Sequence, residues 1–282
     1  MIKLIPLNID EKVAFEQIIS KKHISNRVTL EKIKPAIFED YDMYFNNETR
    51  LQILNPDNRI GVAEKVLLHA AYKNGKKIEE IKAKILKNMP DVIREKCPYC
   101  MLSEPNTFDH YLDKKTFPEY SVFSRNLVPC CSKCNSLKGS KFLTNNRKRM
   151  FISFYFDKMP KNSFLKVQID IENNIPYLRQ LTVEFEDDTD ISNIIETHFK
   201  ELQLCERYKL PISTRLSCIW NELSSYEDYS VEDLKDIIKK KINAIERQYG
   251  NNYWETCLYK GILANDELIR LICKKTTEFC QR

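Results

Sequence analysis

Two Cys-x-x-Cys pairs are the residues of this sequence best suited to chemistry. Cys97 and Cys100 form the first pair, and Cys131 and Cys134 form the second. Zinc takes four such thiolates in a tetrahedron, and two pairs separated by a loop supply them. The pattern predicts one structural zinc; in a reducing compartment, disulfides are the weaker alternative. Cys130 breaks the two-residue spacing, and we expect it to fill space beside the site.

The loop between the pairs carries Asp109-His110 within the segment "FDHYL". A neutral imidazole can take a proton from water near pH 7, and a carboxylate binds a hard cation. We expect short strands at 108–112 and 126–129 and a helix that begins near Cys134 and carries Asn135 on its first turn. This order of elements would bring Asp109, His110 and Asn135 together beside one cation. Taken singly, these residues have ordinary structural roles, and only their combination indicates a site.

The stretch from Cys97 to Gly139 resembles the HNH endonuclease family, whose nuclease core is a ββα-metal fold. The segments "CPYC", "FDHYL", "FPEYS", "NLVPCCSKCN" and "KG" are similar to one bacterial subgroup. The resemblance places His110, Asn126 and Asn135 at the three family positions, as the His-Asn-Asn variant. It implies that His110 is the general base and that Asp109 and Asn135 bind Mg²⁺ or Mn²⁺. Asn126 would brace the loop through backbone hydrogen bonds without touching the metal.

One position departs from the subgroup pattern. The subgroup continues "DHYLPK", whereas this chain has Asp113 before Lys114. Loss of the proline would loosen the loop, and an added carboxylate beside a phosphate site puts a role for Lys114 in question.

The resemblance also implies a function. An enzyme of this family hydrolyses phosphodiester bonds of nucleic acid, with DNA favoured over RNA as the substrate here. The subgroup resembles the HNH components of Septu-type bacterial anti-phage systems, which act beside an ATPase. The chain lacks a Gly-x-x-x-x-Gly-Lys-Ser/Thr loop, so a partner protein would supply the ATPase. The alternatives are an RNA-directed toxin that cuts tRNA and a catalytically inactive, zinc-stabilised nucleic-acid-binding module.

Net charge alone does not identify a nucleic-acid partner, because 45 basic residues are nearly offset by 40 acidic ones. Basic residues do gather directly after the second cysteine pair, where they can neutralise phosphates. A solvated surface is the alternative interpretation of this segment. The expected nucleic-acid contacts are Lys114, Lys138, Lys141, Arg147, Lys148 and Arg149. The aromatic residues that follow, Phe151 and 154–156, are expected to be core.

The remaining pattern predicts an α+β protein: a zinc-stabilised HNH core embedded in a mainly helical chain, with a short strand pair after the core. The expected domains are a helical N-terminal region (1–95), the nuclease core (96–150) and an α+β then helical region (151–282). Apolar spacing predicts helices at 11–20, 61–72, 78–89, 190–204 and 230–250, the last opened by Ser230 and Asp233. Alternating residues predict strands at 164–172 and 177–186, joined by a turn.

No apolar run is long enough to span a bilayer, and the N-terminus becomes charged too early for a signal peptide. We therefore expect a cytoplasmic protein without a membrane partner. His198 shares a helical face with isoleucines and is expected in the core. The remaining cysteines lack metal spacing and are expected to be buried apolar residues: Cys205, Cys218, Cys257, Cys273 and Cys280.

Overall fold

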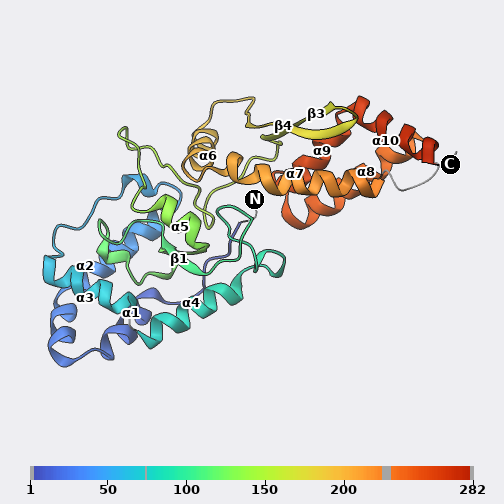
Figure 1. The fold of residues 1–282 in the computed structure, drawn as a ribbon. Coiled ribbons are helices and arrows are strands. Elements are labelled where there is room, and N and C mark those ends of the chain that lie inside the picture. The colour runs from blue at the N-terminus through green and yellow to red at the C-terminus, as the bar shows by residue number, and fades with distance from the viewer. Residues whose placement is uncertain (1–2, 74, 224–229, 280–282) are drawn as a thin grey trace. The chain divides into compact units, whose positions relative to one another are not determined.

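The computed structural model describes residues 3–73, 75–223 and 230–279, with helices and two small antiparallel strand pairs (Figure 1). The predicted α+β class is therefore confirmed at this level. The chain forms two compact units, residues 2–158 and 159–282. The regions predicted as an N-terminal helical part and as a nuclease core both lie in the first unit. None of the described helices is long and apolar enough to cross a membrane.

Four helices form the N-terminal part of the first unit. They are α1 (Glu11–Ser20), α2 (Ile24–Asn46), α3 (Val62–Lys73) and α4 (Lys76–Asn88). The predicted helix 11–20 is confirmed, and its start is fixed by Asp10, whose side chain accepts hydrogen bonds from the Lys12 and Val13 amides. Pro35 lies inside α2. Short 3-10 helices follow at η1 (Leu51–Ile53), η2 (Asp91–Ile93), η3 (Pro118–Tyr120) and η4 (Ser124–Asn126).

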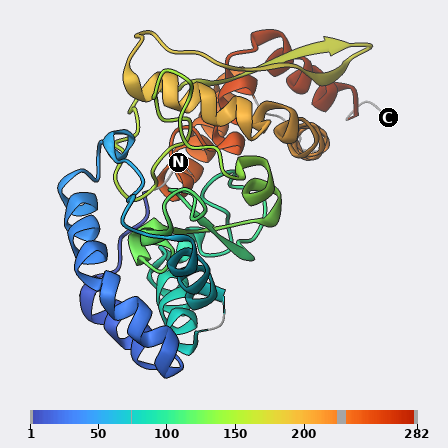
Figure 2. The ribbon, with the colours of Figure 1, turned by 90° about the vertical axis from the view of Figure 1, so that its left-hand side faces the viewer.

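A hairpin and a short helix complete this unit. Strands β1 (Thr107–His110) and β2 (Leu127–Cys130) are antiparallel, and α5 (Ser132–Lys138) follows directly. The predicted strands are present, with bounds shifted by one or two residues. Helix α5 begins earlier than predicted because Cys131 is its N-cap residue, and its sulfur accepts from the Cys134 amide. Helices α1–α4 (blue to cyan) lie on one side of this green segment (Figure 2).

The second unit opens with the predicted hairpin. Strands β3 (Leu165–Glu172) and β4 (Ile175–Val183) pair antiparallel, with a register shift between Gln168 and Ile169. The connecting residues Asn173 and Asn174 have φ of 50° and 60°, which asparagine adopts more readily than most residues. Strand β4 begins two residues before the predicted bound, because the turn needs only the two asparagines.

The described helices that follow this hairpin are α6 (Asp190–Glu201), α7 (Leu204–Leu223), α8 (Val231–Tyr249), α9 (Trp254–Leu263) and α10 (Asp266–Phe279). Helix α7 packs on β4 and α9 on β3. The predicted Ser230–Asp233 capping box is present. On α9, a β-carbon added to Gly261 would lie 2.6 Å from the Val167 carbonyl oxygen, so close packing on β3 requires glycine there.

The core predictions divide into confirmed and wrong ones. Phe151 and 154–156 are buried, as is His198. Among the remaining cysteines, Cys257 is buried, but Cys205 and Cys273 are half-buried. Cys218 is exposed, so its predicted burial is wrong: it lies on the solvent side of the amphipathic helix α7. Cys280 lies outside the described residues.

Candidate metal centre and the residues beside it

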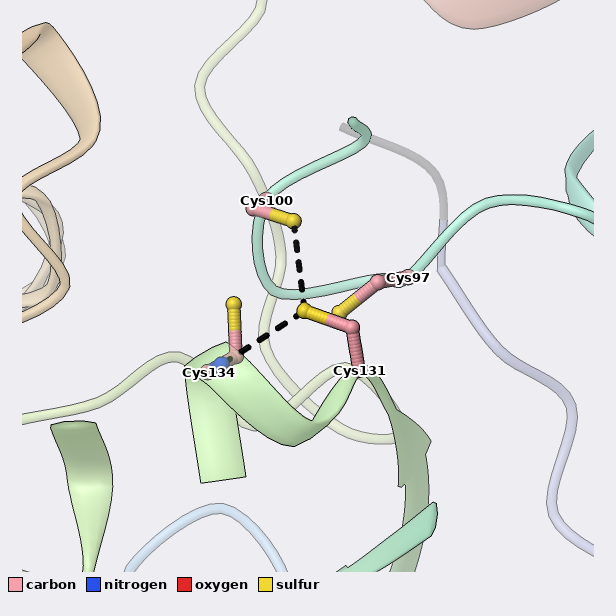
Figure 3. A group of neighbouring side chains, drawn as sticks. All are labelled: Cys97, Cys100, Cys131 and Cys134. Carbon is pink, nitrogen blue, oxygen red and sulfur yellow. Dashed lines mark hydrogen bonds between the residues drawn. The ribbon is translucent and has the colours of Figure 1, made fainter. Parts of the chain in front are cut away.

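The four cysteines of the two pairs form one cluster (Figure 3). Their sulfur atoms all lie within 4.8 Å of one another, and all four residues are buried. The Sγ atoms of Cys100 and Cys131 are 3.9 Å apart, far beyond the roughly 2.05 Å of a disulfide. A tetrahedral zinc with Zn–S bonds of about 2.3 Å places its sulfurs about 3.8 Å apart. The cluster therefore fits a structural zinc site, as predicted.

Local backbone hydrogen bonds shape each cysteine pair. In the first pair, the amides of Cys100 and Met101 donate to the Cys97 carbonyl, and Met101 takes a φ of 54° that lets the chain turn sharply. In the second pair, the Cys134 amide donates to the Cys131 sulfur at 3.5 Å. Amide donation to a sulfur stabilises a thiolate, which is the form that binds metal. The local structure thus prepares both pairs as ligands.

Cys130 is fully buried and lies outside the sulfur cluster. It ends β2, where it pairs with Thr107 of β1. Burial raises the pKa of its thiol well above the usual range, and the nearby Asp109 carboxylate raises it further. Cys130 therefore remains a neutral thiol that fills space behind the hairpin, as the sequence predicted.

Asn126 closes the loop that follows β1. Its Oδ1 accepts from the Leu112 amide at 2.7 Å, and its Nδ2 donates to the carbonyls of Leu112 at 3.0 Å and Tyr120 at 3.2 Å. The side chain is fully buried. These contacts are the backbone-bracing interactions that the resemblance implies for this position.

His110 lies at the end of β1 and is almost buried, with 7% of its surface exposed. Its Nε2 lies 2.9 Å from the Ser121 carbonyl oxygen, which can only accept, so Nε2 carries the proton. In the neutral ring the lone pair is then at Nδ1. Burial, helped by the nearby charges of Lys114 and Lys138 and opposed by the Ser121 contact, lowers the pKa of His110 to about 3.

The carboxylate of Asp109 forms a buried ion pair with Lys138. Lys138 Nζ lies 3.0 Å from the Asp109 carboxylate and 2.9 Å from the His110 carbonyl oxygen. The Tyr99 hydroxyl donates to Asp109 Oδ2 at 2.7 Å. Burial raises the pKa of Asp109, and Lys138 opposes that shift. The carboxylate is therefore already neutralised by an ammonium group.

Asn135 completes the residues expected to hold a catalytic cation. Its Nδ2 lies 3.2 Å from Thr107 Oγ1 and 3.5 Å from the Phe108 carbonyl oxygen, so the amide is held against β1. Together with the Asp109–Lys138 pair, this arrangement leaves no set of oxygen donors assembled for Mg²⁺ or Mn²⁺. The residues as they lie do not fit a bound divalent cation.

Two of the basic residues expected to contact nucleic acid are buried in ion pairs. Lys138 pairs with Asp109, and Arg149 forms two hydrogen bonds with Asp157, at 2.8 and 3.1 Å. Each cation is desolvated and neutralised by a carboxylate as it lies here, and the predicted contact of these two residues with nucleic acid stays a prediction. Lys141, Arg147 and Lys148 are exposed. Arg147 also donates to the Gln52 carbonyl at 3.1 Å.

Tyr72 of α3, which no motif marked, lies beside His110, and Lys82 of α4 lies beside Tyr72. The ring of Tyr72 meets the His110 ring edge-on, with 4.3 Å between centroids. Lys82 and the predicted contact residue Lys114 both place their ammonium groups over the Tyr72 ring. His69 Nε2 lies 2.7 Å from the Lys114 carbonyl oxygen. These contacts join segments far apart in sequence, and no local sequence pattern predicts them.

The site is thus a hairpin and helix closed by four thiols compatible with zinc knuckles. The chain is similar to protein ea31 of Escherichia phage lambda, with 26% identity over 228 residues, covering 75% of this chain and 76% of the phage protein. No family model matches the chain, and no solved structure matches it.

Proposed function

We propose that this protein is an endonuclease of the HNH type that hydrolyses phosphodiester bonds, with DNA favoured over RNA. The observation that carries the proposal is the β1–β2–α5 element, closed by four thiols, in which each motif residue has a defined place. Asn126 braces the loop through both backbone groups of Leu112. A zinc module that only binds nucleic acid has no need of an Asp-His pair at the end of β1.

In this proposal His110 is the general base. The Ser121 carbonyl holds the proton on Nε2 and leaves the lone pair of the neutral imidazole at Nδ1. The burial that lowers its pKa keeps the imidazole unprotonated at neutral pH but also weakens it as a base, so the proposal requires that substrate binding relieve this burial. Nδ1 takes a proton from a water molecule, the resulting hydroxide attacks phosphorus, the bond to the 3′ oxygen breaks, and the departing 3′ oxygen takes up a proton from solvent water. The products carry 5′-phosphate and 3′-hydroxyl ends.

The motif resemblance also implies a catalytic divalent cation, which does not follow from the position of His110. Mg²⁺ or Mn²⁺ would offset charge on the phosphoryl oxygens, with Asp109 and Asn135 as protein ligands. Because Asp109 is paired with Lys138, no step above is assigned to a cation. The anti-phage role and the ATPase partner likewise rest on the motif resemblance alone.

A second candidate function is a zinc-stabilised nucleic-acid-binding module without activity. One observation favours it: the side chains of His110 and Asp109 are 7% and 2% exposed, so a phosphate cannot reach them without a movement of neighbouring residues. Under this alternative the motif residues only stabilise the hairpin. An RNA-directed toxin would use the same chemistry as the leading proposal and differ in substrate.

The test is to sequence the ends of cellular DNA and RNA after controlled expression of the wild type and of His110→Ala. The nuclease proposal expects new ends bearing 5′-phosphate with the wild type alone. His23→Ala is the matched control, because His23 is an exposed histidine at the start of α2. Identical end profiles for the wild type and His110→Ala would favour the binding module, and ends confined to RNA would favour the toxin.

A further inference from the structure

Tyr72 of α3 gathers two ammonium groups next to His110. Lys82 Nζ lies 4.1 Å and Lys114 Nζ 4.5 Å from the centroid of the Tyr72 ring. The same ring contacts His110 at 4.3 Å between centroids. The two lysines come from α4 and from the loop after β1, so three separate segments of the first unit meet at one aromatic ring.

The charge around this ring is positive. Lys73 and Lys115 lie near enough to Lys114 to act on its charge, as does Lys82. The neighbouring carboxylates are Glu79, which pairs with Lys82 at 2.8 Å, and Asp113. The Glu79 side chain is 61% exposed and that of Lys82 is 15% exposed, so the pair is partly screened by salt and offsets part of the charge of Lys82. Among the charged groups that act most strongly on Lys114, three are lysines and one is a carboxylate, so positive charge predominates there.

The type of contact distinguishes these lysines from the other cations of the site. Lys138 and Arg149 are neutralised by buried carboxylates. A cation–π contact instead fixes the position of an ammonium group while leaving its full charge in place. Lys82 and Lys114 are therefore ordered by Tyr72; Lys114 keeps its charge for an anion, and Lys82 shares its charge with Glu79.

The loop that carries Lys114 is also tied to α3. His69 Nε2 lies 2.7 Å from the Lys114 carbonyl oxygen, and since a carbonyl only accepts, His69 donates. Two contacts, one to the backbone and one to the side chain, thus fix Lys114 against the same helix. Lys82 is fixed to the same ring by its own contact.

We propose that Lys82 and Lys114, ordered by Tyr72, bind a backbone phosphate of nucleic acid that flanks the bond to be cut. The inference rests on the proposed nuclease function and gives it a substrate-binding wall built from the N-terminal helices. Phosphate contacts of this kind fix the register of a strand without reading its sequence. In this proposal Lys82 and Lys114 make the phosphate contacts that the sequence analysis expected from Lys138 and Arg149, which are buried.

The experiment measures binding of labelled duplex, single-stranded DNA and structured RNA to full-length zinc-loaded His110→Ala protein, so that no substrate is cut. Into this background are added Lys82→Gln, Lys114→Gln, Glu79→Gln and, as the control, Lys84→Gln. Lys84 is an exposed lysine of α4 about 200° round the helix from Lys82. Affinity is recorded against salt concentration, and zinc content and melting temperature report on folding.

Lys82→Gln and Lys114→Gln should each weaken binding several-fold and reduce the slope of log affinity against log salt by about 0.7 to 0.9. Glu79→Gln should strengthen binding because it frees the charge of Lys82, and a Tyr72→Phe change should cost less affinity than Tyr72→Leu. The inference is wrong if the two lysine variants match Lys84→Gln while the parent protein binds. If the parent protein binds none of the three nucleic acids, both this inference and the proposed nuclease function are wrong.

Discussion

Asn126 and Leu112 are joined by two hydrogen bonds that use both backbone groups of Leu112. The Leu112 amide donates to Asn126 Oδ1 at 2.7 Å, and Asn126 Nδ2 donates to the Leu112 carbonyl at 3.0 Å. A third bond reaches the Tyr120 carbonyl. One buried side chain thereby fixes the loop after His110 to the start of β2, which gives the candidate base its position.

Asn126→Ala should therefore destabilise the first unit. The change leaves buried backbone groups without partners, at about 1–3 kcal/mol for each group left unsatisfied. Denaturant unfolding monitors the free energy. Asn88→Ala is the control, because Asn88 makes a single exposed bond to the Ile5 carbonyl. Equal losses for the two variants would contradict a bracing role for Asn126.

Zinc should be present at about one ion per chain, and Cys131→Ser should lower both zinc content and melting temperature, because four buried sulfurs bind the ion and close the hairpin. Elemental analysis and thermal unfolding measure the two effects. Cys218→Ser, at an exposed cysteine of α7, should change neither. A Cys131→Ser protein with full zinc content would remove this ligand set.

Removing either partner of the Asp109–Lys138 ion pair should lower the free energy of unfolding. Each residue is buried, so either Asp109→Ala or Lys138→Met leaves an uncompensated charge, at about 3–5 kcal/mol. The double variant should recover part of the loss, and a double-mutant cycle measured by denaturant unfolding gives the coupling. Added Mg²⁺ should not restore Asp109→Ala. Restoration by Mg²⁺ would show instead that Asp109 is a cation ligand.

Stability should depend on pH through Glu119. Burial raises the pKa of this carboxyl from 4.5 to about 8, and the nearby Asp40 carboxylate raises it further. Between these values the folded chain holds a proton that the unfolded chain has lost, so the free energy of unfolding falls as pH rises from about 4.5 to 8.

Glu119→Gln should remove this contribution. The variant should have a flatter pH profile, by up to about 1.4 kcal/mol per pH unit, and should be more stable than the wild type at pH 8. Glu95→Gln, at an exposed position, is the control. Unfolding at a series of pH values measures both, and a Glu119→Gln profile parallel to that of the wild type would contradict the assignment.

The thiol centre could be predicted from the sequence because its information is local. Two Cys-x-x-Cys spacings name the ligands, and Ser230 with Asp233 marks the start of α8. The brace by Asn126 was predictable only through the motif resemblance. In each case residues close in sequence, or a known pattern, carry the signal.

Burial of charge and contacts between distant helices could not be predicted. Lys138 and Arg149 lie in a basic stretch, yet each folds inward onto a carboxylate that the linear pattern does not pair with it. Tyr72 of α3 contacts His110, and Lys82 of α4 contacts Tyr72, although these residues are far from His110 in sequence. The burial of Cys218 was wrongly predicted because cysteine is usually a buried residue type, whereas this one lies on the exposed face of α7.

The most direct test of the central claim is the cleavage rate of purified, zinc-loaded wild-type protein compared with His110→Ala. Plasmid DNA, single strands and structured RNA are the substrates, with and without Mg²⁺ or Mn²⁺, and His23→Ala is the control. The nuclease account predicts a loss of about 10²- to 10⁴-fold for His110→Ala at unchanged zinc content and binding. Equal cleavage by wild type and His110→Ala, or no cleavage of any substrate by the wild type, would contradict it.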